Sequence, residues 1–245
     1  MYLNYDVRVR WRFGAGGPAF GFSGDGLHGS AAGGRVSAQS DVLTWSWSER
    51  SFSLSLYVMT EKELMLSGLP YSAEDMRLLK ELNATKDVIH RYNALVPSQE
   101  EEKKAILKEL LGHIADDQIC INQPFYCDYG KQISVGKRFF ANFNFTVLDE
   151  APVTIGDNCF IGPNVSIYTA CHSTDPVERN TRREWAEPVT IGDNVWIGGS
   201  VTILPGVTIG SNTTIGAGSV VTKDIPDNVV AAGNPCRVIR KLEAE

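Results

Sequence analysis

An aliphatic residue returns at every sixth position over the C-terminal half of the chain, and this period constrains the fold more than any other feature. The series includes Val135, Ala141 and Val147 and then, after two extra residues, Ile155, Ile161, Ile167, Ile191, Ile197, Ile203, Ile209, Ile215 and Val221. Ile191 lies four whole periods beyond Ile167, so the series continues through an inserted loop. Neither the period of two of a strand nor the period of about 3.6 of a helix explains it.

A second, smaller residue sits four positions after most of these aliphatic residues: Cys159, Val165, Cys171, Val195, Val201, Val207, Thr213 and Ser219. The pattern suits a triangular coil in which the aliphatic side chain fills an interior corner. The residue after it is expected to turn the chain, where glycine or asparagine permits a positive φ. Stacked coils bury a column of aliphatic side chains and pair their backbones in parallel. The sequence therefore predicts a mainly β protein with a parallel β-helix, since an irregular β-sandwich would not keep one register.

Helices are expected before the β-helix. Ser72 with Asp75, and Ser98 with Glu101, match the capping pattern in which a serine and an acidic residue three positions later satisfy the first amides of a helix. The segment Glu100–Leu111 places Ile106, Leu107, Leu110 and Leu111 on one stripe. We expect a small helical cap over residues 59–115 and the β-helix, with its C-terminal segment, over residues 116–245.

The first 58 residues differ in composition from the rest, since they hold 9 of the 23 glycines and no lysine. Gly14–Gly34 has no clear period, so it is expected to be disordered or loosely attached. Thr44–Val58 alternates well enough to be a strand, although the sequence identifies no partner for it. Met59 and the residues after it read like the start of a bacterial enzyme. Residues 1–58 are thus interpreted as an upstream extension or a wrongly chosen start codon, with a genuine accessory segment as the alternative.

Bulk properties exclude several function classes. A formal charge of -6 and a pI near 5.3 argue against a nucleic-acid partner, because binding phosphates requires clustered Lys and Arg. Five scattered cysteines without CxxC spacing suggest neither a disulfide framework nor a zinc site. No apolar run or signal-peptide pattern is present, so no membrane partner is expected. We expect a cytoplasmic protein.

The inserted loop, residues 171–188, is the main candidate for chemistry, because function concentrates where loops leave a regular solenoid. His172 lies at its root and is the only histidine in the predicted β-helix. A neutral imidazole can take a proton from a hydroxyl at physiological pH. A surface histidine without a function is the competing interpretation. The adjacent Cys171 occupies the small interior position of its hexapeptide, so core packing is expected rather than a nucleophilic role.

Six motifs, in this order, closely resemble the maltose and galactoside O-acetyltransferases over nearly all of residues 59–245. They are Phe139-Phe-Ala-Asn142-Phe-Asn144, Tyr168-Thr-Ala-Cys-His172, Asp175-Pro-Val-Glu-Arg-Asn180, Pro188-Val-Thr-Ile-Gly-Asp-Asn-Val-Trp196-Ile-Gly-Gly199, Val221-Thr-Lys-Asp-Ile-Pro226 and Gly233-Asn-Pro-Cys-Arg237. The resemblance implies a left-handed parallel β-helix behind a helical cap. It also implies a homotrimer with active sites between neighbouring β-helices, and transfer of an acetyl group from acetyl-CoA to a sugar hydroxyl without a metal.

The resemblance also implies roles for individual residues. His172 would be the general base, with Asn142 as a polar partner and Glu150 in support. Acceptor-binding residues would be Asp75, which also competes for a capping role, Asp128, Asn142 and Phe140. Coenzyme A would be contacted by Trp196, Gly199, Ala217, Thr222, Lys223, Arg237 and Arg240. Among these, the Gly199 amide would stabilise the oxyanion of the tetrahedral intermediate. The cationic side chains would bind the phosphates of coenzyme A. Trp196 could instead be a subunit contact.

Two departures from the family pattern bear on the acceptor. The segment Leu82-Asn83-Ala84-Thr85 stands where relatives carry an arginine-rich stretch, which leaves the acceptor open. Phe140 replaces the tyrosine of the galactoside enzyme, as in maltose-type enzymes, which favours glucose or maltose. The alternatives are a non-sugar hydroxyl compound such as an antibiotic, or a non-catalytic structural β-helix. A γ-class carbonic anhydrase is argued against because a single histidine cannot hold zinc.

Overall fold

The computed structural model describes residues 35–39, 42–47, 50–52 and 59–243. The chain divides into two units, Met1–Thr60 and Glu61–Glu245. In the first unit, β1 (Arg35–Gln39), β2 (Val42–Trp47) and β3 (Arg50–Phe52) form an antiparallel sheet in that order. A single strand was expected over Thr44–Val58, but the described part of this segment contains part of β2 and all of β3. The sequence identified no partner for the expected strand, and in the structure β2 pairs with β1 and β3. The segments Gly14–Gly34 and 53–58 lie outside the described residues.

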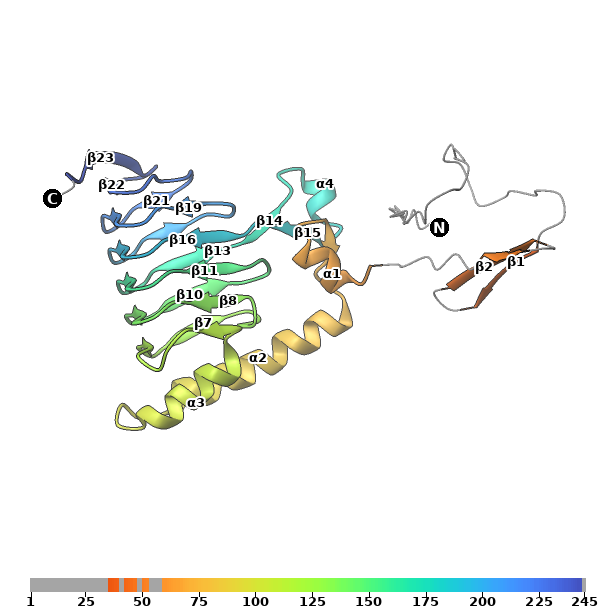
Figure 1. Ribbon diagram of the computed structural model, residues 1–245, viewed down its shortest axis with the longest axis horizontal. Coiled ribbons are helices and arrows are strands. Elements are labelled where there is room, and N and C mark those ends of the chain that lie inside the picture. Colours follow the sequence, from red (N-terminus) through yellow and green to blue (C-terminus); the bar gives the residue numbers. More distant parts are fainter. Residues whose placement is uncertain (1–34, 40–41, 48–49, 53–58, 244–245) are drawn as a thin grey trace. The chain divides into compact units, whose positions relative to one another are not determined.

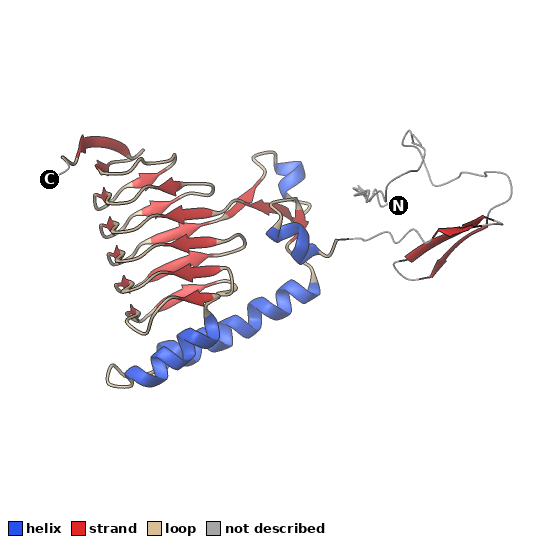
Figure 2. Ribbon diagram, viewed as in Figure 1, coloured by secondary structure: helices blue, strands red, loops and turns tan. Residues whose placement is uncertain are grey.

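The second unit is dominated by three parallel sheets that form a β-helix (Figures 1 and 2). One contains β7 (Phe125–Cys127), β10 (Phe145–Leu148), β13 (Ser166–Tyr168), β18 (Thr202–Ile203) and β21 (Val220–Val221). A second contains β5 (His113–Ile114), β8 (Ile133–Val135), β11 (Val153–Ile155), β16 (Val189–Ile191) and β19 (Thr208–Ile209). The third, called the outer-row sheet below, contains β6 (Cys120–Ile121), β9 (Phe140–Ala141), β12 (Phe160–Ile161), β17 (Trp196–Ile197), β20 (Thr214–Ile215), β22 (Val229–Ala232) and the antiparallel β23 (Arg237–Lys241).

The predicted hexapeptide series fills the interior of this β-helix. Every aliphatic position of the series from Val135 to Val221 is at most 2% exposed. Ile155 pairs with Ile191, 36 residues later, and Ile191 pairs with Ile209, 18 residues later. The series therefore continues through the inserted loop, as the sequence predicts, and the parallel β-helix is confirmed.

The position of the turn within each hexapeptide was predicted wrongly. The positive φ lies three residues after the aliphatic position, as at Asn158, Asn194 and Asn212, with φ values of 57°, 56° and 56°. The glycine directly after the aliphatic residue serves a different purpose, because stacked coils approach closely there. A Cβ at Gly162 would lie 2.6 Å from the backbone nitrogen of Gly199. Side-chain amides of the turn asparagines bond from coil to coil, for example Asn194 Nδ2 to Asn212 Oδ1 at 3.0 Å.

Helices cover one end of the stack. Figure 1 shows α2 (Met76–Ala94) and α3 (Glu100–Leu110) lying across the end opposite β23. Leu107 and Leu110 of α3 and Ile89 and Tyr92 of α2 join the core of the β-helix, so they close its open end with apolar side chains. The short α1 (Glu61–Leu66) and β4 (Tyr71–Ser72) precede these helices.

The expected serine caps were wrong in both cases. The N-cap of α2 is Asp75 itself, whose carboxylate accepts from the amides of Arg77 and Leu78, while Ser72 lies in β4. The N-cap position of α3 is Gln99, and its side chain makes no cap bond. An aspartate is as effective a cap as a serine, so the pattern located the α2 start but misassigned the residue.

The inserted loop leaves the stack as a separate antiparallel sheet, which Figure 1 shows projecting sideways with α4 (Pro176–Arg179). The sheet consists of β14 (Ala170–His172), β15 (Arg183–Ala186) and β4, in that order. A strand from the cap therefore completes the hairpin of the inserted loop. No helix of the described residues is long and apolar enough to cross a membrane.

Candidate active site

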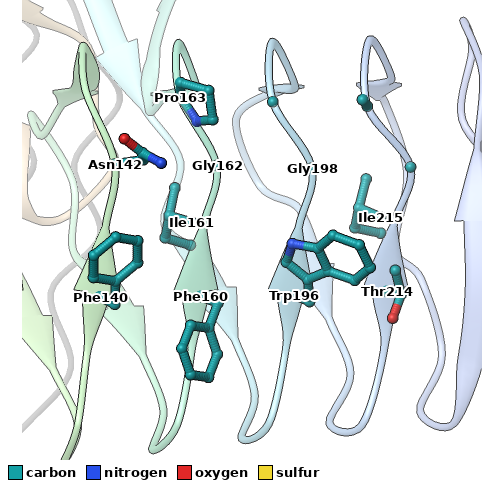
Figure 3. A pocket seen from close by; sticks show the side chains of 13 residues that line it. Phe140, Asn142, Phe160, Ile161, Gly162, Pro163, Trp196, Gly198, Thr214 and Ile215 are labelled. Atoms are coloured by element: carbon teal, nitrogen blue, oxygen red, sulfur yellow. The ribbon is translucent and has the colours of Figure 1, made fainter.

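A groove of about 410 Å³ lies on the outer face of the outer-row sheet. Figure 3 shows Phe140, Phe160 and Trp196 side by side on successive coils. Phe160 and Trp196 are 54% and 58% exposed, which is high for large aromatic side chains. Exposed aromatic side chains gathered at a groove indicate a surface that binds another molecule.

The strand register extends this row toward the C-terminus. Trp196 pairs with Thr214, Thr214 with Val230, and Val230 with Arg240. Because neighbouring strands lie about 4.8 Å apart, Arg240 stands about 14 Å beyond Trp196 along the stack. The row therefore runs from aromatic side chains to a cation.

The structure brings together five of the residues that the sequence singled out. Phe140, Asn142, Trp196, Gly199 and Ala217 all line the groove. The Gly199 carbonyl accepts from Gly218, but the Gly199 amide donates no hydrogen bond within the part of the chain that the structure describes. This amide is thus free to donate to a ligand in the groove.

Other predicted residues lie outside the groove lining. Lys223, Arg237 and Arg240 are exposed and Thr222 is half-buried, and all four belong to the C-terminal part of the unit. Arg237 donates through Nη1 to the carbonyl of Cys236 at 2.7 Å, and no carboxylate partner is found for Arg237 or Arg240 among the described residues. Their charges therefore remain available for an anion.

His172 is presented by the inserted loop and does not line the groove of its own chain. It ends β14, and its side chain is 57% exposed. Its Nε2 lies 3.5 Å from Oε2 of Glu184, the residue directly opposite on β15. The other oxygen of Glu184 accepts a hydrogen bond from the hydroxyl of Tyr71 on β4. A carboxylate beside one ring nitrogen favours the tautomer with the proton on that nitrogen, which leaves the other nitrogen as a base.

The expected interior position of Cys171 was wrong. Cys171 is only partly buried, because at this point β14 already leaves the coil and pairs with Trp185 of β15. Burial nevertheless raises the pKa of the Cys171 thiol to about 11, with a further increase from the charge of Glu187. The thiolate needed by a nucleophile is therefore disfavoured.

The two extra residues of the hexapeptide series form an acidic corner of the β-helix. Asp149 is fully buried and accepts from the amides of Asp128 and Tyr129 at 3.0 and 2.8 Å. Burial raises its pKa to about 7, while these backbone bonds oppose the shift. Glu150 is 8% exposed, and burial raises its pKa well above the ordinary value. A side-chain hydrogen bond with Asp128 raises this pKa further. A protonated Glu150 can therefore donate to the Asp128 carboxylate.

The remaining predicted acceptor residues make local bonds. Asp75 is half-buried and caps α2 through Oδ1 only. Asn142 accepts from the amide of Phe143 at 2.8 Å, which leaves its NH₂ group for a ligand. Glu150, which the resemblance implies supports the histidine, accepts a hydrogen bond from the Thr169 hydroxyl at 3.3 Å through Oε2. The carboxylate that lies beside His172 is that of Glu184.

Glu184 and Tyr71 were missed by reasoning from the sequence. Their proximity to His172 depends on an antiparallel hairpin within a polar loop and on a two-residue strand whose Tyr71 lies 113 residues before Glu184. The loop has no alternating hydrophobic pattern that would reveal such strands. Only the resemblance to relatives of known structure could have suggested the pairing.

Comparison with known proteins identifies the family. Residues 64–115 match the maltose acetyltransferase hexapeptide capping motif, and residues 188–223 match the bacterial transferase hexapeptide. The chain is 46% identical over 157 residues to the galactoside O-acetyltransferase of Escherichia coli, covering 64% of this chain and 77% of the relative.

Solved structures agree with these matches. A maltose O-acetyltransferase of Clostridium difficile is 52% identical with a TM-score of 0.75, covering 76% of this chain and 99% of that one. A galactoside acetyltransferase in complex with coenzyme A is 41% identical with a TM-score of 0.73, covering 76% and 92%. The chain therefore belongs to the maltose and galactoside O-acetyltransferase family of hexapeptide-repeat acetyltransferases.

Proposed function

We propose that this protein transfers the acetyl group of acetyl-CoA to a hydroxyl of a small sugar. The observation that carries this proposal is the groove with its aromatic row, a free amide at Gly199 and unpaired cations farther along the same sheet. Family membership supports it, and the related galactoside acetyltransferase was solved with coenzyme A.

Coenzyme A is proposed to lie along the outer-row sheet. Its phosphates would be bound by Lys223, Arg237 and Arg240, which are exposed and lack carboxylate partners among the described residues. The pantetheine arm would run past Thr222 and Ala217 toward Trp196. This path places the thioester carbonyl beside the Gly199 amide, where a hydrogen bond would stabilise the developing oxyanion.

The acceptor hydroxyl is proposed to be activated by His172. As its oxygen attacks the thioester carbonyl, the proton passes to the imidazole nitrogen that faces away from Glu184. The tetrahedral intermediate then collapses, the carbon–sulfur bond breaks, and the imidazolium returns the proton to the sulfur of coenzyme A. Cys171 has no role in this proposed step, and burial, which raises the pKa of its thiol, disfavours a nucleophilic thiolate.

The acceptor is proposed to be bound by hydroxyl-binding side chains. Asn142 retains a free NH₂ group, and Asp75 retains one carboxylate oxygen outside its capping bonds. Asp128 would add a further hydrogen-bond acceptor. Phe140 in place of a tyrosine supports a preference for glucose or maltose.

A homotrimer is proposed to complete the site. His172 is not among the residues that line the groove of its own chain, and in the proposed trimer it would face the groove of a neighbouring chain. Symmetric association of identical chains creates such shared sites.

The proposal is tested by an acceptor screen with acetyl-CoA, in which release of free coenzyme A is followed with glucose, maltose, galactosides and hydroxyl-bearing antibiotics. Turnover with sugars and its loss in His172→Ala are the expected results. Faster turnover with an antibiotic than with any sugar would show that the acceptor is a non-sugar hydroxyl compound. Absence of turnover with every acceptor, despite coenzyme A binding, would contradict the enzymatic proposal.

A further inference from the structure

Three polar side chains stand in a row across the small antiparallel sheet β14–β15–β4. His172 pairs with Glu184, and Glu184 pairs with Tyr71. Directly opposed side chains of antiparallel strands lie on the same face of a sheet. The row therefore links the proposed base to a tyrosine of the helical cap through one carboxylate.

Tyr71 is placed rigidly. Its side chain is fully buried with Met65, Leu78 and Tyr129, although it belongs to a strand of only two residues. The strand is fixed by its neighbours, since the Ser72 amide donates to Glu61 Oε2 at 2.6 Å and Arg183 Nη2 donates to the carbonyl of Pro70 at 2.8 Å. A buried ring on a fixed strand can hold a hydroxyl at one position.

The Tyr71 hydroxyl can only donate to Glu184. Burial raises the pKa of Tyr71 far above its ordinary value, and its bond to Glu184 and the charges of Glu184 and Glu150 act in the same direction. The phenol therefore stays protonated, and its proton points to Oε1 of the carboxylate. With Oε1 occupied, Oε2 is the oxygen directed at His172.

We propose that Tyr71 is a positioning residue that holds the Glu184 carboxylate against His172. The inference rests on the proposed function, since it concerns the orientation of the proposed base. A glutamate side chain has several rotatable bonds, and Glu184 is partly accessible to water. Without a second anchor the carboxylate would sample other rotamers and release the imidazole. A charge-assisted hydrogen bond from a buried phenol removes that freedom.

The other titratable groups around this row come from several elements. Glu150 from the acidic corner acts on Tyr71 through its charge when ionised. Tyr129, which follows β7, senses the charges of Glu150, Asp128, Glu184 and Glu81 of α2, and its own pKa is raised chiefly by burial. No cation is paired with Glu184 within the described residues except His172 when protonated. The Tyr71 hydroxyl is thus the neutral donor that stabilises this carboxylate.

The test uses Tyr71→Phe, Glu184→Gln and the double variant in the full chain. Tyr92→Phe is the matched control, because Tyr92 is also buried and its hydroxyl donates to the carbonyl of Ile121 at 2.5 Å rather than to Glu184. Two measurements are made on each: steady-state kinetics with acetyl-CoA, and the tautomer of His172 from ¹⁵N shifts of labelled imidazole without substrates. Resonances are assigned with His172→Ala.

The wild type is expected to show one His172 tautomer, protonated on the nitrogen facing Glu184. Tyr71→Phe is expected to give a mixture of tautomers and to lower kcat roughly tenfold, with KM for acetyl-CoA unchanged. In the Glu184→Gln background the same substitution is expected to have no further effect, because both act through one carboxylate. Tyr92→Phe is expected to lower the thermal midpoint but leave kcat and the tautomer unchanged.

Three results would overturn the inference: an unchanged tautomer and kcat in Tyr71→Phe, multiplicative losses in the double variant, or an equal loss in Tyr92→Phe. If Tyr71→Phe does not fold, Glu184→Asp replaces it in the test, because the shorter aspartate side chain cannot reach both His172 and Tyr71. This variant is expected to give the same mixture of His172 tautomers, and a single tautomer in it would also overturn the inference. The tautomer measurement needs no acetyl transfer. A tautomer that responds to Tyr71→Phe in a chain that acetylates no acceptor would leave this inference standing and refute the proposed function.

Discussion

His172 and Glu184 are cross-strand partners on β14 and β15, with Nε2 and Oε2 3.5 Å apart. This contact joins the root of the inserted loop to its returning strand. It gives the exposed imidazole a fixed acidic neighbour, so the position of His172 depends on the hairpin as well as on the coil beneath it.

Replacing His172 by alanine is expected to reduce turnover by roughly two to four orders of magnitude, because the acceptor hydroxyl loses its general base. Coenzyme A binding, measured by calorimetry, and the size of the assembly in solution are expected to be unchanged. His90→Ala is the control, since His90 is exposed on α2 and is not among the residues that line the groove. Retained turnover in His172→Ala would remove His172 from the mechanism.

Trp196→Ala is expected to weaken coenzyme A binding about thirtyfold, as for loss of an aromatic anchor worth about 2 kcal/mol. The thermal midpoint should change little, because the side chain is 58% exposed. Tyr126→Ala removes another exposed aromatic side chain, on β7 in a different sheet, and should leave the affinity as it is. Equal affinity in the Trp196 variant would indicate a subunit contact instead.

Asn194→Ala is expected to destabilise the β-helix by about 1–2 kcal/mol, because alanine resists the positive φ of 56° at this turn. Asn194→Gly separates the two contributions of this residue, since glycine accepts the φ but loses the amide bonds to Asn158 and Asn212. Chemical denaturation should therefore rank the glycine variant between wild type and alanine. A glycine variant less stable than the alanine variant would show that the positive φ is not the main reason for the loss of stability in Asn194→Ala.

Glu150→Gln is expected to flatten the pH dependence of stability. Burial raises the folded-state pKa of Glu150 above its ordinary 4.5, so its contribution is fully present below about pH 4.5 and is lost as the pH rises toward the folded pKa. Asp149, with a pKa raised to about 7, adds a second loss in the same direction. The thermal midpoints at pH 5 and pH 8 should differ less in Glu150→Gln than in the wild type. An equal difference in the two proteins would show that the raised pKa of Glu150 does not contribute to the pH dependence of stability.

The six-residue period predicted the β-helix and its interior because each aliphatic residue of the series occupies an equivalent corner, as Ile155 and Ile191 do. The resemblance singled out Asn142, Trp196 and Gly199, and the structure shows that these three residues line one groove because they stand at fixed points of that register. Cys171 was misplaced because the period continues in sequence after β14 has left the coil. The link from His172 to Tyr71 depends on tertiary pairing that no local pattern encodes.

The strand β4 covers the outer side of β15, and this has a consequence for truncated forms of the protein. A chain beginning at α2 would keep the stack but leave the backbone groups of β15 unsatisfied along one edge. Such a bare edge is a template for joining another molecule's strand, and natural proteins protect it. Because Tyr71 and Ser72 pair with this edge, we expect a chain without them to aggregate more readily through the hairpin that carries the imidazole.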